Sequence, residues 1–230
     1  MSAERDTVIV VSNGIAPGEL DGVGLPAAGY VIAADGGAAT ALELGLRVDE
    51  LIGDLDSVSA QVQARVAGAG ARVRRFPVAK DATDLELALA AAVSRDPAPR
   101  RVVVLGGAGG RLDHLLAGAL LLAAPQWAGV DATHTQVEAW LGRAKVTVVR
   151  DRAELAPFAP GALVTLLAVG GVARGVTTSG LRYPLDGHDL VPGTTLGVSN
   201  EFTSAMATVS VTGGVLLAVQ PAPVVDGEFG

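Results

Sequence analysis

Short apolar segments alternate with helix-forming segments through the first half of the chain, and this alternation constrains the fold more than any other feature. Strands that are apolar on both faces are typical of a parallel sheet that helices cover on both sides. We therefore predict an α/β fold for this half. The predicted strands are Thr7–Val11, Tyr30–Ala34, Glu50–Ile52, Ala71–Phe76 and Arg101–Leu105, and the predicted helices are Ala38–Leu44, Val58–Ala67, Asp81–Val93 and Asp113–Ala124.

Helical signals end near Gln136, and short strands separated by turn residues follow at regular spacing, a pattern typical of a β-sandwich. The predicted strands are Val137–Leu141 and Lys145–Val149, joined as a hairpin by Gly142-Arg143, and then Leu163–Val169, Val172–Thr177, Thr195–Val198, Met206–Val211 and Val215–Val219. The sequence thus predicts two domains. Residues 1–135 form an N-terminal Rossmann-like parallel sheet with helices on both faces, and residues 136–230 form a C-terminal all-β sandwich.

Composition and charge argue against several classes of protein. The formal net charge of −7 is unlike that of a nucleic-acid-binding protein, which usually carries a basic patch or stripe. The sequence has no cysteine for a disulfide, a thiolate metal site or a nucleophile. The N-terminus lacks a signal-peptide pattern, and the longest apolar runs fall short of the roughly 18 to 20 residues of a membrane-spanning helix. We therefore expect a soluble, cytoplasmic protein with no membrane or nucleic-acid partner.

Polar residues gather where the predicted strands of the first half end. Ligands of open α/β sheets bind outside the carboxyl ends of the strands, which meet at one edge. The polar clusters are Ser12-Asn13-Gly14, Asp35-Gly36-Gly37, Gly53–Ser57, Gly106–Gly110 and, opening a predicted helix, Lys80-Asp81-Ala82-Thr83-Asp84. Several carboxylates on one edge of a sheet repel each other unless a cation or another interaction offsets their charges. These carboxylates belong to Asp35, Asp54, Asp56, Asp81, Asp84 and Asp113.

Asp54 and Asp56 stand only two residues apart in this set. Side chains two apart in an extended segment leave from the same side, so both would point into one small volume. Such a pair suits a hard cation such as Mg²⁺, which is often bound by one or two carboxylates together with substrate phosphates. The alternative is an Asp-rich turn in which each aspartate bonds its own backbone, and this stretch taken alone favours the turn.

Two other clusters also allow two interpretations. Asp81 and Asp84 could cap the helix that follows them, although a capping carboxylate can also serve as a ligand. The Gly106–Gly110 loop precedes a helix whose N-terminus would suit a phosphate, but it is neither a P-loop nor a dinucleotide-binding fingerprint. Arg111 and Asp113 directly after the loop favour a functional role, because arginine can bind a phosphate through two N–H groups.

The second half contains two polar loops, Gly180–Leu185 and Gly197–Phe202. Tyr183 and Phe202 in these loops are more often packing residues than ligands. An aromatic side chain at the tip of a loop can nevertheless stack on a planar ring.

Taken together, the motifs resemble those of the thiamine pyrophosphokinase family in its bacterial form. The matching segments are Ala34–Ala38, Ile52–Ser57, Lys80–Asp84, Gly109–His114, Gly180–Leu185 and Gly197–Phe202. Each motif is weak alone, but they follow the family's order from about Val8 to Val219. The family's fold, an α/β nucleotide domain followed by a β-sandwich, agrees with the fold predicted above.

The resemblance implies transfer of the diphosphate of ATP to the hydroxyl of thiamine, which gives thiamine diphosphate and AMP in a Mg²⁺-dependent reaction. It assigns ATP and Mg²⁺ to the first domain, and thiamine and dimerisation to the second, with the active site at the subunit interface of a homodimer. The implied catalytic residues are Asp54, Asp56, Asp84, Arg111 and Asp113, with Asp54, Asp56 and Asp84 as metal ligands. ATP would contact Asn13, Asp35, Gly36, Gly37, Asp81, Thr83, Gly109 and Gly110, and thiamine would contact Tyr183, Ser199 and Asn200.

Two other functions remain as alternatives. A pyrophosphokinase acting on another alcohol, such as a hydroxymethyl pterin, would use the same metal and ATP apparatus. The matches at Gly180–Leu185 and Gly197–Phe202 count against it. A nucleotide-binding regulator without catalysis would be favoured by loss of the acidic set, yet all six aspartates are present.

Overall fold

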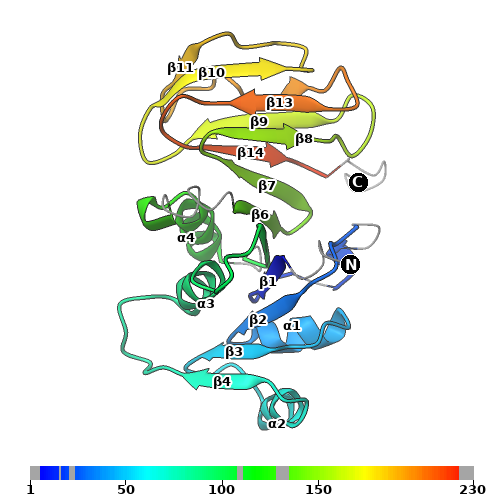
Figure 1. Ribbon diagram of the computed structural model, residues 1–230, viewed down its shortest axis with the longest axis vertical. Helices are drawn as coiled ribbons and strands as arrows, with labels where there is room; N and C mark the ends of the chain where they lie inside the picture. The colour runs from blue at the N-terminus through cyan, green and yellow to red at the C-terminus, as the bar shows by residue number, and fades with distance from the viewer. Residues whose placement is uncertain (1–5, 16, 21–23, 108–110, 128–134, 223–230) are drawn as a thin grey trace. The chain divides into compact units, whose positions relative to one another are not determined.

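The computed structural model describes residues 6–15, 17–20, 24–107, 111–127 and 135–222. The chain forms two compact units (Figure 1). One comprises Met1–Leu121 and Gly129–Gly142, and the other comprises Leu122–Ala128 and Arg143–Gly230. Among the described residues, no helix has the length and apolar character that crossing a membrane requires.

The first unit is built on a parallel sheet, as the sequence predicts. Its strands are β1 (Thr7–Val11), β2 (Tyr30–Ala34), β3 (Glu50–Gly53), β4 (Arg72–Arg75), β5 (Arg101–Leu105) and β6 (Gln136–Leu141), in the order β6-β5-β1-β2-β3-β4. Neighbouring strands in this order pair in parallel. The order reverses between β1 and β5, because β2 to β4 lie on one side of β1 and β5 lies on the other. Open α/β sheets bind ligands at such a reversal.

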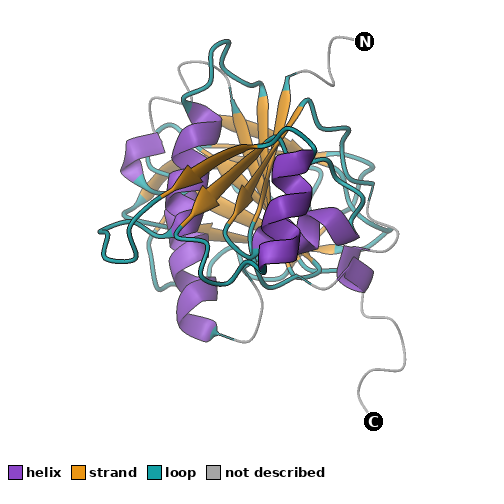
Figure 2. Cartoon of the chain, turned by 90° about the horizontal axis from the view of Figure 1, so that it is seen from below, coloured by secondary structure: helices purple, strands orange, loops and turns teal. Residues whose placement is uncertain are grey.

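Helices cover both faces of this sheet (Figure 2). They are α1 (Gly37–Glu43), α2 (Ala60–Gly68), α3 (Asp84–Val93) and α4 (Leu112–Leu122). A short 3₁₀-helix consists of Pro17–Leu20. One core cluster joins Ile9 and Leu51 from the strands to Ala41 of α1 and Val66 of α2. Helix α3 also contacts β1, β2 and β3, but its buried residues lie outside that cluster, so α3 packs on the opposite face.

Some boundaries differ from the prediction, and α3 is the clearest case. The helix begins at Asp84 rather than Asp81, because Thr83 takes the N-cap position with an extended backbone (φ −72°, ψ 160°). The Thr83 hydroxyl accepts a hydrogen bond from the backbone N–H of Glu86 at 3.1 Å. Capping by threonine satisfies one of the free N–H groups of the first turn.

Strand β6 belongs to the first unit, whereas the predicted boundary at residue 135 places it in the second. It pairs in parallel with β5 from Gln136 to Trp140, and its central residues are buried. The division between the units falls after Gly142. Pairing with β5, together with an ion pair at 2.7 Å between Glu138 of β6 and Arg101 of β5, holds β6 in the parallel sheet.

The second unit is a sandwich of two antiparallel layers. Its strands are β7 (Ala144–Val149), β8 (Arg152–Leu155), β9 (Leu163–Ala168), β10 (Ala173–Ser179), β11 (His188–Leu190), β12 (Asn200–Glu201), β13 (Ala207–Ser210) and β14 (Leu216–Gln220). The layers have the strand orders β12-β9-β14-β7 and β11-β10-β13-β8. Val164 and Leu216 from one layer pack with Val176 and Val209 from the other. The strand predicted at Thr195–Val198 is wrong, because none of these residues is in a strand and residues 196–198 form a turn.

Candidate active site

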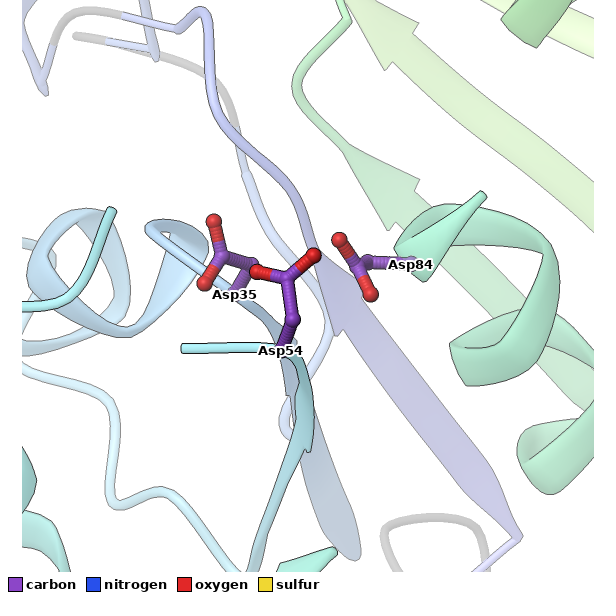
Figure 3. Close-up of side chains that lie close together, drawn as sticks. All are labelled: Asp35, Asp54 and Asp84. Atoms are coloured by element: carbon purple, nitrogen blue, oxygen red, sulfur yellow. The ribbon is translucent and has the colours of Figure 1, made fainter. Parts of the chain in front are cut away.

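Three carboxylates converge at the carboxyl edge of the parallel sheet (Figure 3). Asp35 follows β2, Asp54 follows β3, and Asp84 is the first residue of α3. One oxygen from each lies within 4.8 Å of the others. We call these three residues the Asp triad.

The backbone around Gly53 allows this convergence. Gly53 adopts a φ of 151°, and a Cβ atom there would lie 3.0 Å from Cβ of Asp35 and 3.2 Å from Cγ of Asp84. Asp35 itself has a φ of 45°, and its N–H donates to the carbonyl of Ile52 at 2.8 Å. A side chain at position 53 would therefore push two members of the triad apart.

Lys80 places an ammonium group against the Asp triad. Its Nζ lies 3.1 Å from Oδ2 of Asp54 and 3.1 Å from Oδ1 of Asp84, and its side chain is 14% exposed. The hydrogen bond from Lys80 is the main cause of a lowered pKa at Asp54. Burial acts to lower the pKa of Lys80, but its contacts with the two carboxylates prevail and raise it. Burial raises the pKa of Asp84 against the opposing effect of Lys80.

The Asp triad keeps unused capacity for a cation. Asp35 is only 7% exposed. Its Oδ1 is buried and has no hydrogen-bond partner within the described residues. Oδ1 of Asp84 is also buried and has no hydrogen bond there, although it forms the ion pair with Lys80. A buried carboxylate oxygen without a partner is costly. An all-oxygen donor set of this kind fits Mg²⁺.

Asp56 lies outside the Asp triad. Leu55 adopts a left-handed φ of 66° and is buried in the core, so a turn rather than an extended segment joins Asp54 to Asp56. The exposed Asp56 side chain instead accepts a hydrogen bond from the Ser57 hydroxyl at 3.0 Å. Its N–H donates to Oδ1 of Asp54 at 3.2 Å, so Asp56 helps to hold Asp54 in place.

Two predicted ATP contacts lie in the segment before α3. The Asp81 side chain is exposed, and Thr83, also exposed, is the N-cap of α3 described above. Asp81 directly follows Lys80, which supplies the ammonium group, and Thr83 lies three residues after it.

Glycines let the backbone approach closely at the ends of β1 and β5. A Cβ at Gly36 would lie 2.5 Å from the Asn13 side chain, and one at Gly37 would lie 2.2 Å from the Val11 carbonyl oxygen. Gly107 donates its N–H to the carbonyl of Asn13 at 2.7 Å. This brings the loops after both strands together at the reversal of strand order. The predicted ATP contacts Gly109 and Gly110 lie outside the described residues.

Arg111 and Asp113 form an exposed pair at the start of α4. Nε of Arg111 donates to Oδ1 of Asp113 at 3.2 Å, and a terminal guanidinium nitrogen lies 2.5 Å from Oδ2. The arginine lowers the pKa of Asp113 to about 2. Asp113 is not a member of the Asp triad.

The loops of the second unit hold Tyr183 at the surface. Tyr183 is 64% exposed, whereas Asn200 is only 3% exposed. The Asn200 amide accepts from the Tyr183 N–H at 3.0 Å and donates to the Tyr183 carbonyl at 2.7 Å. Ser199, exposed and with a φ of 56°, donates its N–H to Thr165 at 3.0 Å. Asn200 thus fixes the backbone that carries the exposed ring.

The sequence prediction of site residues did not include Lys80, Arg182 or Glu201. Arg182 and Glu201 form an ion pair at 2.7 Å beside Tyr183. Lys80 and Asp84 carry opposite charges four residues apart, and this spacing could have indicated from the sequence that they form an ion pair.

Comparison with known proteins identifies the family. A model described as "Thiamin pyrophosphokinase, catalytic domain" matches residues 25–133, and one described as "Thiamin pyrophosphokinase, vitamin B1 binding domain" matches residues 149–216. The chain belongs to the thiamine pyrophosphokinase family. The first match contains the Asp triad, and the second contains the loops around Tyr183 and Asn200.

Relatives in this family match most of the chain. Thiamine pyrophosphokinase of Bacillus subtilis strain 168 is 27% identical over 199 residues, which cover 82% of this chain and 86% of the relative. The crystal structure of the Bacillus subtilis enzyme gives a TM-score of 0.76 at 26% identity, covering 94% of this chain and 98% of that chain. The Geobacillus thermodenitrificans structure gives 0.74 at 26% identity, covering 95% and 98%.

Proposed function

We propose that the chain is a thiamine pyrophosphokinase that uses ATP and Mg²⁺. The observation that carries this proposal is the match of both halves of the chain to the two domains of one enzyme family. The Asp triad at the carboxyl edge of the sheet supports it, because phosphoryl-type transfer depends on positioning and charge neutralisation more than on covalent help from the protein.

In the proposed reaction, the hydroxyl oxygen of thiamine forms a bond to the β-phosphorus of ATP. The bond from that phosphorus to the oxygen bridging the α-phosphate breaks, and AMP leaves with this oxygen. The hydroxyl proton passes to a carboxylate or to water. The products are thiamine diphosphate and AMP, so one P–O bond forms and one breaks.

Asp35, Asp54 and Asp84 would hold Mg²⁺, with Asp56 beside them orienting Asp54 through its N–H. When bound, the cation would neutralise charge on the phosphates. The sequence predicts Asp56 as the third metal ligand, whereas the Asp triad has Asp35 in that role. We choose Asp35 because its buried Oδ1 has no hydrogen bond within the described residues.

The remaining residues of the first unit would bind ATP. Asn13, Gly36 and Gly37 lie where β1 and β2 end, and Gly36 packs directly against the Asn13 side chain. Arg111, released from Asp113, would contact the phosphates through its fork of donors. Asp81, Thr83, Gly109 and Gly110 would complete the contacts predicted from the sequence.

Thiamine would bind to the loops of the second unit. The exposed Tyr183 ring offers a surface for a planar heterocycle, and Ser199 offers a hydroxyl next to Asn200. In this proposal Asn200 acts through the Tyr183 backbone, because its amide oxygen and nitrogen are already bonded there.

A homodimer with its active site between subunits is part of the proposal. An exposed row on α4 supports a second copy, although it lies in the first unit and the resemblance assigns dimerisation to the second. Leu112, Leu116 and Leu120 are 66%, 53% and 57% exposed. Residues four apart lie on the same side of a helix, so the three leucines form one apolar row. Contiguous exposed apolar surface is uncommon on a monomer and favours a second copy as its cover.

We also propose that the enzyme acts in the cytoplasm.

Replacing Leu116 by glutamate is expected to turn the dimer into a monomer, because the interface would have to bury an unpaired charge. Sedimentation velocity measures the change in mass. Ala64→Glu is the matched control, since Ala64 is an exposed residue of α2 and the substitution adds the same charge. A Leu116→Glu protein that sediments like the wild type would remove α4 from the interface.

Phosphorus NMR of the purified protein with ATP, Mg²⁺ and thiamine tests the function directly. The expected products are AMP and thiamine diphosphate, both of which require thiamine. ADP with thiamine monophosphate would move the attack to the γ-phosphorus. No change that depends on thiamine would contradict the proposal and favour a pterin alcohol or a binding protein without turnover.

A further inference from the structure

Lys80 occupies the Asp triad with a positive charge of its own. Its ammonium group lies 3.1 Å from carboxylate oxygens of both Asp54 and Asp84, and its side chain is largely buried. We propose that Lys80 is an exchangeable counter-ion of the active site: it neutralises these carboxylates while no divalent cation is bound, and it leaves them when one binds. The inference rests on the metal site proposed above.

The charges of the site favour an exchange. Three carboxylates and one ammonium group leave an excess of two negative charges in a small volume. Without Lys80, three carboxylates at this separation would repel each other strongly. With a divalent cation on the same oxygens, the ammonium group and the cation would repel each other, because like charges at such short range interact strongly in a partly buried site.

The contacts of Lys80 allow its ammonium group to move. The residue precedes the Thr83 cap of α3, outside any helix or strand, and carries its charge on a flexible four-carbon stem. Nζ already lies 3.2 Å from the carbonyl oxygen of Pro77. After leaving the carboxylates, the ammonium group would keep this carbonyl as a partner and would be free to meet solvent or a phosphate.

Asp35 provides an independent sign that the ammonium group is not the final occupant of the site. Its buried Oδ1 has no hydrogen-bond partner within the described residues, although an oxygen of the same carboxylate lies within 4.8 Å of oxygens of Asp54 and Asp84. The ion pairs of Lys80 involve only the other two members of the triad. A permanent structural bridge would be expected to satisfy the third carboxylate as well.

Chemical labelling of lysine tests the exchange in the full-length protein, because Lys80 and Lys145 are the only lysines in the sequence. The rate of acetylation at each lysine is measured by peptide mass spectrometry in EDTA and during a Mg²⁺ titration. We expect Lys80 to react slowly without metal and on the order of tenfold faster at saturating Mg²⁺, since a buried charge pair is then broken. The rate at Lys145 should stay constant.

A second measurement separates displacement from a simple change in reactivity. Lys80→Met removes the charge and keeps an unbranched side chain, and Mn²⁺ binding is followed by electron paramagnetic resonance without nucleotide. Loss of a competing cation is expected to tighten Mn²⁺ binding by roughly tenfold and to lower the melting temperature of the metal-free protein. Lys145→Met is the control and should change neither quantity.

The outcomes distinguish this inference from the function on which it rests. Mn²⁺ that binds Lys80→Met equally well or more weakly, or a Lys80 that stays protected at saturating Mg²⁺, would overturn the counter-ion role alone. A wild-type protein that binds no Mn²⁺ would overturn the proposed metal site and the exchange with it. Tighter Mn²⁺ binding together with exposure of Lys80 would support the exchange.

Discussion

Replacing Asp54 by asparagine is expected to abolish turnover while leaving the fold intact. The asparagine keeps the shape of the side chain and an oxygen that accepts the Asp56 N–H, so the turn after β3 should survive. It removes one of the three carboxylates of the Asp triad and one of the two that Lys80 contacts. Loss of one fixed group that stabilises developing charge typically lowers kcat on the order of 10²- to 10³-fold. Steady-state assays of AMP release measure the loss, and circular dichroism checks the fold.

Three further substitutions sharpen this prediction. Glu43→Gln is the control for loss of a charge, since Glu43 is an exposed residue of α1 away from the triad. Asp35→Asn should lower kcat as severely as Asp54→Asn, and Asp56→Asn should lower it less, because Asp56 lies outside the triad. If Asp54→Asn turned over normally, its assignment as a metal ligand would be wrong. If Asp56→Asn lost more activity than Asp35→Asn, Asp56 rather than Asp35 would be the third ligand.

Replacing Gly37 by alanine is expected to destabilise the protein by about 3 kcal/mol, which is a large effect for a single methyl group. The added Cβ would lie 2.2 Å from the carbonyl oxygen of Val11 and 2.7 Å from its carbonyl carbon. Both atoms belong to the backbone of β1, a central strand that pairs with β2 and β5 and cannot yield without breaking its pairing. The free energy of unfolding is measured by urea denaturation.

Gly68→Ala is the matched control for this prediction. Gly68 is the last residue of α2, and apart from its own helix backbone and chain neighbours no atom lies within 4 Å of the position that its Cβ would take. Alanine there should leave the stability unchanged or raise it by about 0.5 to 1 kcal/mol, because alanine is the better helix former. A Gly37→Ala protein as stable as Gly68→Ala would mean that α1 does not approach β1 as closely as described.

The sequence by itself determined the architecture and the order of the elements. Runs of β-branched residues predict β1, β2 and β5 with the bounds that the structure has, because a strand buried on both faces needs continuous apolar character. The fold class, an α/β parallel sheet followed by a β-sandwich, is confirmed. The sequence does not predict β8 or β12, because they are only four and two residues long and only pairing with a distant strand makes them strands.

The tertiary structure decided which residues share the site. Local spacing pairs Asp54 with Asp56, but Leu55 between them is buried in the core with a left-handed backbone, and Asp56 is not one of the three carboxylates that converge. Asp35, Asp54 and Asp84 come together only because parallel strands and α3 end at the same edge. The same long-range packing brings Lys80 among the carboxylates and adds β6 to the first unit. Sequence spacing fixes neighbours along the chain, whereas contacts between distant segments depend on how their apolar faces are buried.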